Sequence, residues 1–80
     1  MNEQQIKDEL QSILDTIVPG ASLDELEPDD EIMETLDIDS FDFLRVIQKL
    51  EERLKVSIPE SDYPRLETLG ALLNYLTVRV

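Results

Sequence analysis

Ser40 is the residue whose type and position point most directly to chemistry. It stands between Asp39 and Asp42, where the spacing of apolar residues predicts that a helix begins. The first backbone amides of a helix lack partners within it, and the helix dipole adds partial positive charge there. A phosphate ester on the Ser40 hydroxyl would therefore be stabilised, once a partner's cations or a metal offset the two aspartates. The alternative is that Ser40 only caps the helix, as serine often does.

Phe41, the next residue, is predicted to point away from the core. Successive residues of a helix turn by about 100°, which places Phe41 near Gln48 and well away from the apolar stripe of the same helix. A partly exposed aromatic side chain surrounded by carboxylates is typical of a docking anchor with an electrostatic rim. The alternative is that Phe41 folds under the preceding loop, because single surface aromatics also occur without a function.

The composition restricts the classes of function. Nineteen acidic residues against seven basic ones give a net charge of −12, which argues against nucleic acids and anionic membranes and for partners with basic patches. Without cysteine or histidine, the chain cannot form a disulfide, a thiolate nucleophile, a cysteine-ligated zinc site or a Ser-His-Asp triad. Aspartate and glutamate remain the main acid or base candidates, but no clustered pair indicates a tuned pKa. We therefore expect neither a metal site nor an enzyme.

We expect the chain to be a monomer in the cytoplasm. No apolar run approaches the roughly twenty residues of a membrane span, and the N-terminal residues lack the basic and apolar pattern of a secretory signal. A large net charge of one sign also keeps small domains soluble and separate from one another.

The apolar periodicity predicts one domain over residues 1–80, with three main helices and one short helix. The first helix begins at Asn2, whose side chain forms a capping box with Gln5, and Pro19-Gly20 stops it. The acidic segment 20–38 is long for a loop. Its many apolar residues predict that it is ordered, with a helical turn that begins at Pro28.

The second helix is predicted over residues 40–55, with Asp39 as its cap. A short helical turn is expected in residues 56–64, because Pro59 and Pro64 lie too close together to allow a long helix. The last helix begins at Thr68, with Tyr75 at the edge of its buried side. The apolar faces of these two helices contain Phe43, Val46, Ile47, Leu50, Leu54, Leu69, Leu72, Leu73 and Leu76. This pattern is typical of an all-α fold, a small antiparallel helical bundle with a long ordered first loop.

A calcium-binding loop is a competing interpretation of the region around Ser40. The stretch that begins at Asp37 has carboxylates at the first two alternate positions of an EF-hand loop. Its fifth position is Phe41, its sixth is Asp42 where glycine is needed, and its twelfth is Gln48 in place of a bidentate glutamate. We therefore reject a calcium-binding loop.

The chain resembles the acyl carrier proteins, which have an Asp-Ser-Leu or Asp-Ser-Phe motif at the start of their second helix. Asp39, Ser40 and Phe41 match this motif, and the order of helices and loops is similar over nearly the whole chain. In that family a phosphopantetheinyl transferase attaches a 4′-phosphopantetheine arm from coenzyme A to the serine. The terminal thiol of the arm holds an acyl group as a thioester for partner enzymes. The resemblance implies that Ser40 is the attachment site and that the arm supplies the sulfur that the chain lacks.

The resemblance also implies a recognition surface for acyl-loading and acyl-processing enzymes with basic docking patches. The positions where family members meet these enzymes are matched by Asp39, Phe41, Asp42, Glu51 and Glu52. Each carboxylate has the alternative reading of a solvated helix face, and Glu51 has that of an ion pair with Lys55 at i+4.

Two features depart from the family pattern. Many members have glycine at the position of Asp37, so we expect a stiffer entry into the motif. Arg45 stands where carriers of fatty acid biosynthesis often have glutamate, and Lys49 and Arg53 follow on the same helical face. We hypothesise that this basic stripe changes the set of partners and marks a specialist carrier. The alternative is a solvated face of mixed charge, with Asp42 and Glu52 as compensating neighbours.

Two other functions remain possible from the sequence. Phe41 and the segment "IPESDYPRLETL" are also similar to the D-alanyl carrier proteins of the same fold. An unmodified acidic adaptor, in which Ser40 caps the helix and Phe41 binds a partner, is the other. The cargo and the pathway do not follow from the residues. The side chains that would either line or fill an acyl cavity are Ile32, Phe43, Ile47, Tyr63 and Leu66.

Overall fold

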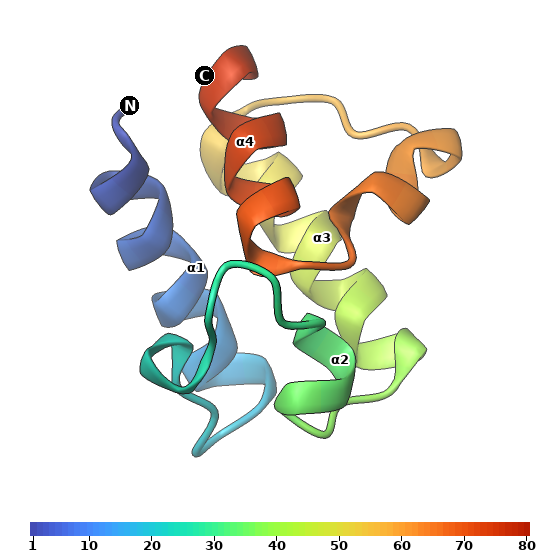
Figure 1. Ribbon diagram of the computed structural model, residues 1–80. Helices are drawn as coiled ribbons and strands as arrows, with labels where there is room; N and C mark the ends of the chain where they lie inside the picture. The colour runs from blue at the N-terminus through green and yellow to red at the C-terminus, as the bar shows by residue number, and fades with distance from the viewer.

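The computed structural model describes residues 1–80 and contains helices joined by turns, without a β-sheet. In chain order the helices are α1 (Glu3–Ile17), the 3₁₀ helix η1 (Leu23–Glu25), α2 (Ile32–Thr35), α3 (Ser40–Leu54), the 3₁₀ helix η2 (Glu60–Leu66) and α4 (Leu69–Arg79). In Figure 1, α1 descends from the N-terminus, α4 ascends beside it and α3 crosses behind. This confirms the predicted all-α bundle of three main helices.

The helix starts follow from local sequence, as predicted. The Asn2 side chain accepts a hydrogen bond from the amide of Gln5 at 2.8 Å, and the Gln5 side chain accepts one from the amide of Asn2 at 2.9 Å. Thr68 caps α4 by accepting from the amide of Ala71 at 3.2 Å. Each cap satisfies amides that have no partner within the helix. The predicted capping box and the predicted start of the last helix are therefore confirmed.

The C-terminal end of α3 lies one residue earlier than predicted. Lys55 adopts the left-handed conformation, with φ 56° and ψ 45°, and its amide donates to the carbonyl of Glu51. The amide of Val56 donates to the same carbonyl at 3.3 Å. A left-handed residue after the last helical turn is a common helix stop. It also reverses the direction of the chain.

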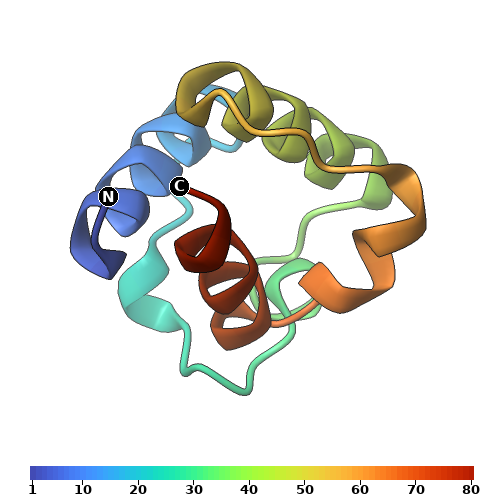
Figure 2. The same ribbon diagram turned by 90° about the horizontal axis from the view of Figure 1, so that it is seen from above.

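After α3 the chain doubles back along the helix, so that η2 lies beside the first turns of α3 (Figure 2). Residues 56–59 are extended, and η2 then occupies seven residues, Glu60–Leu66. A 3₁₀ helix accommodates Pro64, which has no amide hydrogen to donate. The predicted short helical turn is thus confirmed, and it ends at Leu66, two residues beyond the predicted segment.

The segment 18–31 is ordered, as expected, but its helical turn does not start at Pro28. Residues 28–30 form a turn in which the Asp30 side chain accepts from the amide of Glu27 at 2.9 Å. Glu31 is extended and forms an isolated bridge with Thr68, and α2 begins only at Ile32. This pairing with the chain before α4 keeps Glu31 in an extended conformation, so α2 does not begin before Ile32.

Gly70 allows the same loop to approach α4 closely. Its amide donates to the carbonyl of Pro28 at 2.9 Å. A Cβ atom at Gly70 would lie 3.0 Å from that carbonyl oxygen, so any larger residue would push the loop away. Backbone contacts therefore fasten the first loop to the start of the last helix.

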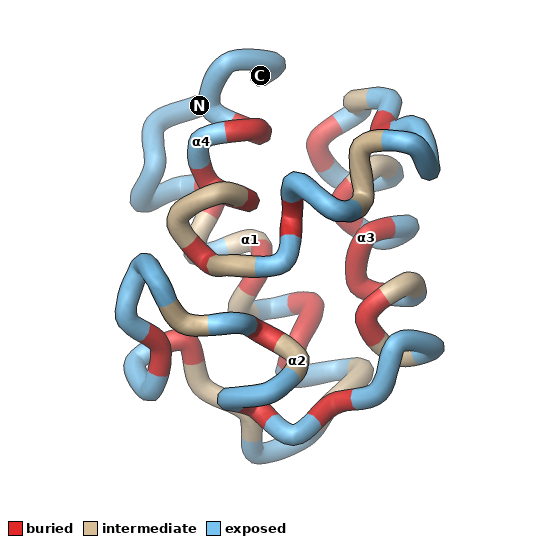
Figure 3. Tube along the Cα trace, turned by 45° about the vertical axis from the view of Figure 1, so that its right-hand side comes forward, coloured by how far each residue is buried: buried red, intermediate tan, exposed pale blue.

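The core consists of 21 buried residues, all of them hydrophobic. Figure 3 shows that the buried positions recur along one side of each main helix, while the opposite side is exposed. The apolar stripe that was predicted for α3, from Phe43 to Leu54, is buried throughout, and so are the four leucines predicted for α4. No helix of the structure combines the length and the apolar composition that crossing a bilayer requires.

Candidate functional site

Ser40 is the first residue of α3, and its hydroxyl is free. Asp39, the preceding residue, caps the helix by accepting a hydrogen bond from the amide of Asp42 at 2.8 Å. The Ser40 side chain is exposed and takes part in no hydrogen bond with the protein. The alternative in which Ser40 serves as the cap is therefore wrong, because Asp39 already fills that role. The serine oxygen is left available for other chemistry.

The turn before α3 holds this serine outside the core. Ile38 is buried, and its amide donates to the carbonyl of Met33 at 2.9 Å. Asp37 takes the left-handed conformation, with φ 55°, which aspartate tolerates better than most residues. Ile38 on one side and Phe43 on the other anchor the chain, and residues 39–41 project between them.

Phe41 is 70% exposed, which confirms the predicted orientation. The alternative in which it folds under the preceding loop is wrong. The carboxylates of Asp39 and Asp42 are its neighbours in the first turn. The Phe41 ring stays in contact with water until a partner covers it. Its removal from water then stabilises the complex.

An open groove of about 230 Å³ begins at Ser40. Three parts of the chain form it, namely α2, the first turns of α3 and the segment η2 with its C-terminal neighbour. The residues that line it are Met33, Ser40, Phe43, Leu44, Tyr63, Pro64 and Glu67. Pro64 and Glu67 carried no signal in the sequence, because they meet Ser40 only after the chain has doubled back along α3. Leu44 lies one turn after Ser40 on α3 and was not singled out.

The five side chains considered for an acyl cavity divide into two groups. Ile32, Ile47 and Leu66 are fully buried and fill the core. Phe43 and Tyr63 reach the groove beside Ser40. Burial, followed by the negative charges of Glu51 and Glu60, raises the pKa of Tyr63 above its ordinary value. This tyrosine therefore stays neutral at physiological pH.

Negative charge is dense around α2 as well. A hydrogen bond with Glu34 raises the pKa of Glu31, and the charges of Glu34 and Glu67 and slight desolvation act in the same direction. Nowhere in the structure do three or more potential ligand side chains come close enough together to hold a metal ion. These carboxylates and those at the start of α3 together give this part of the surface a negative potential.

The basic stripe on α3 is compensated by its neighbours. Arg45 pairs with Asp42 at 3.4 Å, and Lys49 pairs with Glu52 at 3.5 Å, as predicted. Arg53 turns away from the other two and contacts α1 instead. Its guanidinium lies 3.4 Å from a carboxylate oxygen of Glu9 and donates to the hydroxyl of Ser12 at 2.9 Å. Only Arg45 and Lys49 therefore remain as a basic surface of α3.

Glu51 has a role within the fold. Its carboxylate accepts a hydrogen bond from the amide of Ile58 at 3.1 Å and so fastens the returning chain to α3. The alternative ion pair between Glu51 and Lys55 is not formed, since Lys55 has left the helical conformation. Glu52, one residue later, is exposed.

Known proteins match this chain over nearly its full length. The family described as "Phosphopantetheine attachment site" matches residues 4–76. An acyl carrier protein of Streptomyces coelicolor is 28% identical over 79 residues, which cover 99% of this chain and 86% of that protein. One of Chlorobium phaeobacteroides is 29% identical, with 95% and 96% covered. One of Chlamydia trachomatis serovar D is 33% identical, with 75% and 78% covered.

These matches agree with the features of the structure. The helix order, the exposed serine at the start of α3 and the acidic surface around it fall within the matched residues. Relatives of similar length are named as carriers and not as catalysts. The chain belongs to the acyl carrier proteins, whose phosphopantetheine-binding domain carries a 4′-phosphopantetheine group.

Proposed function

We propose that this chain holds an acyl group as a thioester on a 4′-phosphopantetheine arm attached to Ser40, and that it delivers this group to partner enzymes. The observation that carries the proposal is the state of the Ser40 hydroxyl, which is exposed, unbonded and placed at the first position of α3. When bound, the 4′-phosphopantetheine group supplies a thiol, which a chain without cysteine lacks. On this proposal the chain presents its cargo and catalyses no reaction itself.

The residues around Ser40 fit such a group. The backbone amides of Ser40 and Phe41 donate no hydrogen bond within the protein, so they are available to a phosphodiester. Asp39 and Asp42 oppose the added negative charge, and a basic surface of the modifying enzyme offsets them. The groove that starts at Ser40 gives an arm or its cargo a place to lie.

The test is intact-mass spectrometry after incubation with coenzyme A and a phosphopantetheinyl transferase. The unaltered chain is expected to gain one phosphopantetheine adduct, and Ser40→Ala to gain none. Ser57→Ala is the matched control, since Ser57 is also exposed but lies outside any helix, and it should gain the adduct. A chain that gains no mass would instead be an unmodified acidic adaptor. An adduct on Ser40→Ala would place the attachment at another residue.

The proposed recognition surface is the acidic start of α3. Phe41 supplies an exposed apolar anchor, and Asp39 and Asp42 supply charges for basic patches on the partner enzymes. Glu52 extends this surface along the helix. Glu51 already serves the fold through Ile58, so its part in recognition stays a prediction. The net charge of −12 steers the whole protein toward basic partners.

We further propose that Arg45 and Lys49 select the partners of a specialist carrier. Each is about half exposed and held by a carboxylate one turn away, which fixes an ordered pattern of alternating charge on α3. Arg45→Glu with Lys49→Glu should change the relative rates with different acyl-loading enzymes. Lys7→Glu with Lys55→Glu makes the same change in net charge elsewhere and should leave the relative rates unchanged. Unchanged rates with every candidate enzyme after the first pair of substitutions would contradict this role.

The class of cargo can be identified from the mass of the protein isolated from its own cells. An aminoacyl group, as on the similar D-alanyl carriers, and a fatty acyl group differ in the mass that they add beyond the arm. The proposed attachment at Ser40 is the same for both. Mass spectrometry of the native protein therefore separates the two kinds of carrier.

A further inference from the structure

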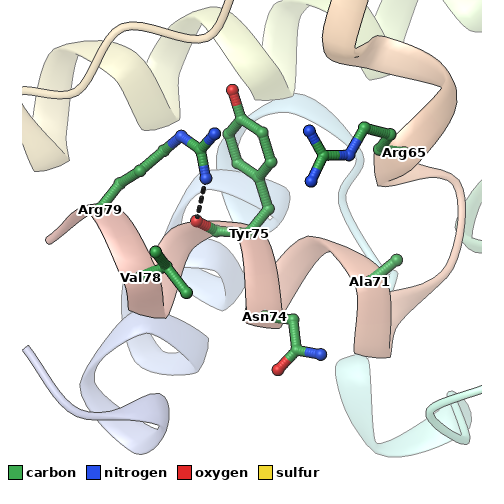
Figure 4. Close-up of a pocket in the computed structure, with 6 residues that line it drawn as sticks. All are labelled: Arg65, Ala71, Asn74, Tyr75, Val78 and Arg79. Atoms are coloured by element: carbon green, nitrogen blue, oxygen red, sulfur yellow. Dashed lines mark hydrogen bonds between the residues drawn. The ribbon is translucent and has the colours of Figure 1, made fainter.

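An open hollow lies on α4 and takes one lining residue, Arg65, from η2. Its volume is about 700 Å³. The residues that line it are Arg65, Ala71, Asn74, Tyr75, Val78 and Arg79 (Figure 4). Val78 is 82% exposed, and apart from Met1 and Phe41 it is the only large hydrophobic side chain left at the surface. The hollow therefore combines an apolar contact point with two arginines.

The two arginines lie on either side of the Tyr75 ring (Figure 4). The guanidinium carbon of Arg79 is 3.5 Å from the ring centroid, and that of Arg65 is 5.6 Å away. Tyr75 donates its hydroxyl hydrogen to Asp62 at 2.6 Å. Burial and this hydrogen bond raise the pKa of Tyr75, so the ring stays neutral. One carboxylate thus faces two guanidinium groups, and the cluster has an excess positive charge. Tyr75, which is predicted at the edge of the buried side of the last helix, has a buried side chain.

Both arginines have hydrogen-bond donors left for a partner. A guanidinium has five N–H donors. Arg79 forms no salt bridge, and one of its N–H groups donates a hydrogen bond to the carbonyl of Tyr75 at 3.1 Å. Arg65 reaches Asp62 only at 3.8 Å, and its side chain is 66% exposed. The stacking on Tyr75 holds Arg79 in position beforehand, which reduces the entropy lost on binding.

The three basic residues of α3 offer a direct contrast. Arg45, Lys49 and Arg53 each lie within 3.5 Å of a carboxylate oxygen of their own. At the α4 hollow, cations outnumber carboxylates, although the chain as a whole has a charge of −12. The net negative charge of the chain repels an approaching carboxylate over most of the surface. On this face Arg65 and Arg79 attract it at short range.

We infer that the α4 hollow is a docking site for an acidic segment of a partner protein. Carboxylates of that segment pair with Arg65 and Arg79, since guanidinium groups bind carboxylates through two parallel hydrogen bonds. An aliphatic side chain of the segment covers Val78 and removes it from water. The residues that line this hollow and those that line the groove at Ser40 have none in common. The site is therefore separate from Ser40, and it does not depend on the proposed carrier function.

The test uses nuclear magnetic resonance of the full chain, labelled with ¹⁵N. The probe is a synthetic peptide Glu-Glu-Leu-Leu-Glu-Glu with both ends blocked. Saturable shifts are expected at the amides of Arg65 and residues 71–79 and not at the start of α3. Arg65→Gln with Arg79→Gln should weaken the binding about tenfold or more, the effect of losing charged hydrogen bonds. A peptide with glutamine in place of every glutamate should be weakened similarly.

Two further variants keep the test decisive. Arg45→Gln with Lys49→Gln removes the same two charges from α3 and should bind the probe as the unaltered chain does. Val78→Asn leaves both arginines in place and should weaken binding severalfold, so the inference remains testable if the double arginine variant does not fold. Shifts that never saturate, shifts scattered over the molecule, or an equal loss in the two double variants would each overturn the docking site.

Discussion

The first turn of α3 and its last turns both carry polar side chains, but these side chains are used in opposite ways. In the first turn, Ser40 has a free hydroxyl and Phe41 is exposed. In the last turns, Glu51 accepts a hydrogen bond from Ile58, and Arg53 contacts Glu9 and Ser12 of α1. Polar side chains of one helix therefore serve the fold at one end and are open to partners at the other.

The difference comes from what each end of α3 packs against. The last turns lie beside α1 and beside the chain that leaves the helix, so polar groups of both segments come within hydrogen-bonding distance. The first turn follows an exposed bend and meets η2 only through the open groove. Its polar atoms thus have water as a partner, and an enzyme can replace that water without breaking the fold.

Replacement of Glu51 should have the largest effect on stability. Glu51→Ala leaves the amide of Ile58 without its acceptor, next to a side chain that is only 3% exposed. An unsatisfied amide of this kind costs about 1 to 3 kcal/mol. We expect the free energy of unfolding, measured by urea denaturation, to fall by about 2 kcal/mol on this basis.

Glu52→Ala is the matched control for this prediction. Glu52 pairs only with Lys49 on an exposed helix face, and such pairs contribute about 0.5 kcal/mol or less. If the two alanine variants were equally stable, the hydrogen bond to Ile58 would not hold the returning chain. Glu51 would then have no role in the fold, like the exposed Glu52.

Replacement of Phe41 should affect modification and leave stability unchanged. Phe41→Ala removes an exposed ring, so the melting temperature should stay the same. We expect kcat/KM for attachment of phosphopantetheine to fall about tenfold, as for an aromatic anchor in an interface. The measurement is the rate of mass gain at several protein concentrations. Val78→Ala removes an even more exposed apolar side chain, from α4, and should leave that rate unchanged. A similar loss in both variants would mean that Phe41 has no specific role.

The features that depend on neighbours in sequence could be predicted without the structure. Asn2 and Asp39 cap their helices as expected, and the last helix starts beside Thr68 as predicted, because a helix start is set by residues within one turn. The apolar stripe of α3 predicted both the buried face and the exposure of Phe41, since helix geometry alone relates these positions. For this reason the sequence alone could point to Ser40, at the start of the helix, as the residue that carries chemistry.

The features that depend on distant segments could not be predicted. Glu51 looked like a partner for Lys55, but Lys55 turns left-handed, and a residue after the helix takes its place. α2 begins at Ile32 because the loop before it pairs with Thr68, 37 positions after Glu31 in the chain. Local spacing contains no information about such contacts. The groove beside Ser40 and the arginine pair around Tyr75 were missed for the same reason.

The smallest expected effect separates the two ends of the basic stripe. Arg53→Gln removes a link between α3 and α1, whose two ion-pair partners are each less than two-fifths exposed, and should cost about 0.5 to 1 kcal/mol of unfolding free energy. Arg45→Gln removes a pair within one exposed turn and should cost less than about 0.5 kcal/mol. A double-mutant cycle of Arg53→Gln with Glu9→Gln isolates the ion pair, and urea denaturation measures each corner. A coupling energy near zero, together with equal costs for the two arginines, would mean that Arg53 is as free as Arg45. In that event all three basic residues would be available to partners, and the contrast between the two ends of α3 would rest on Glu51 alone.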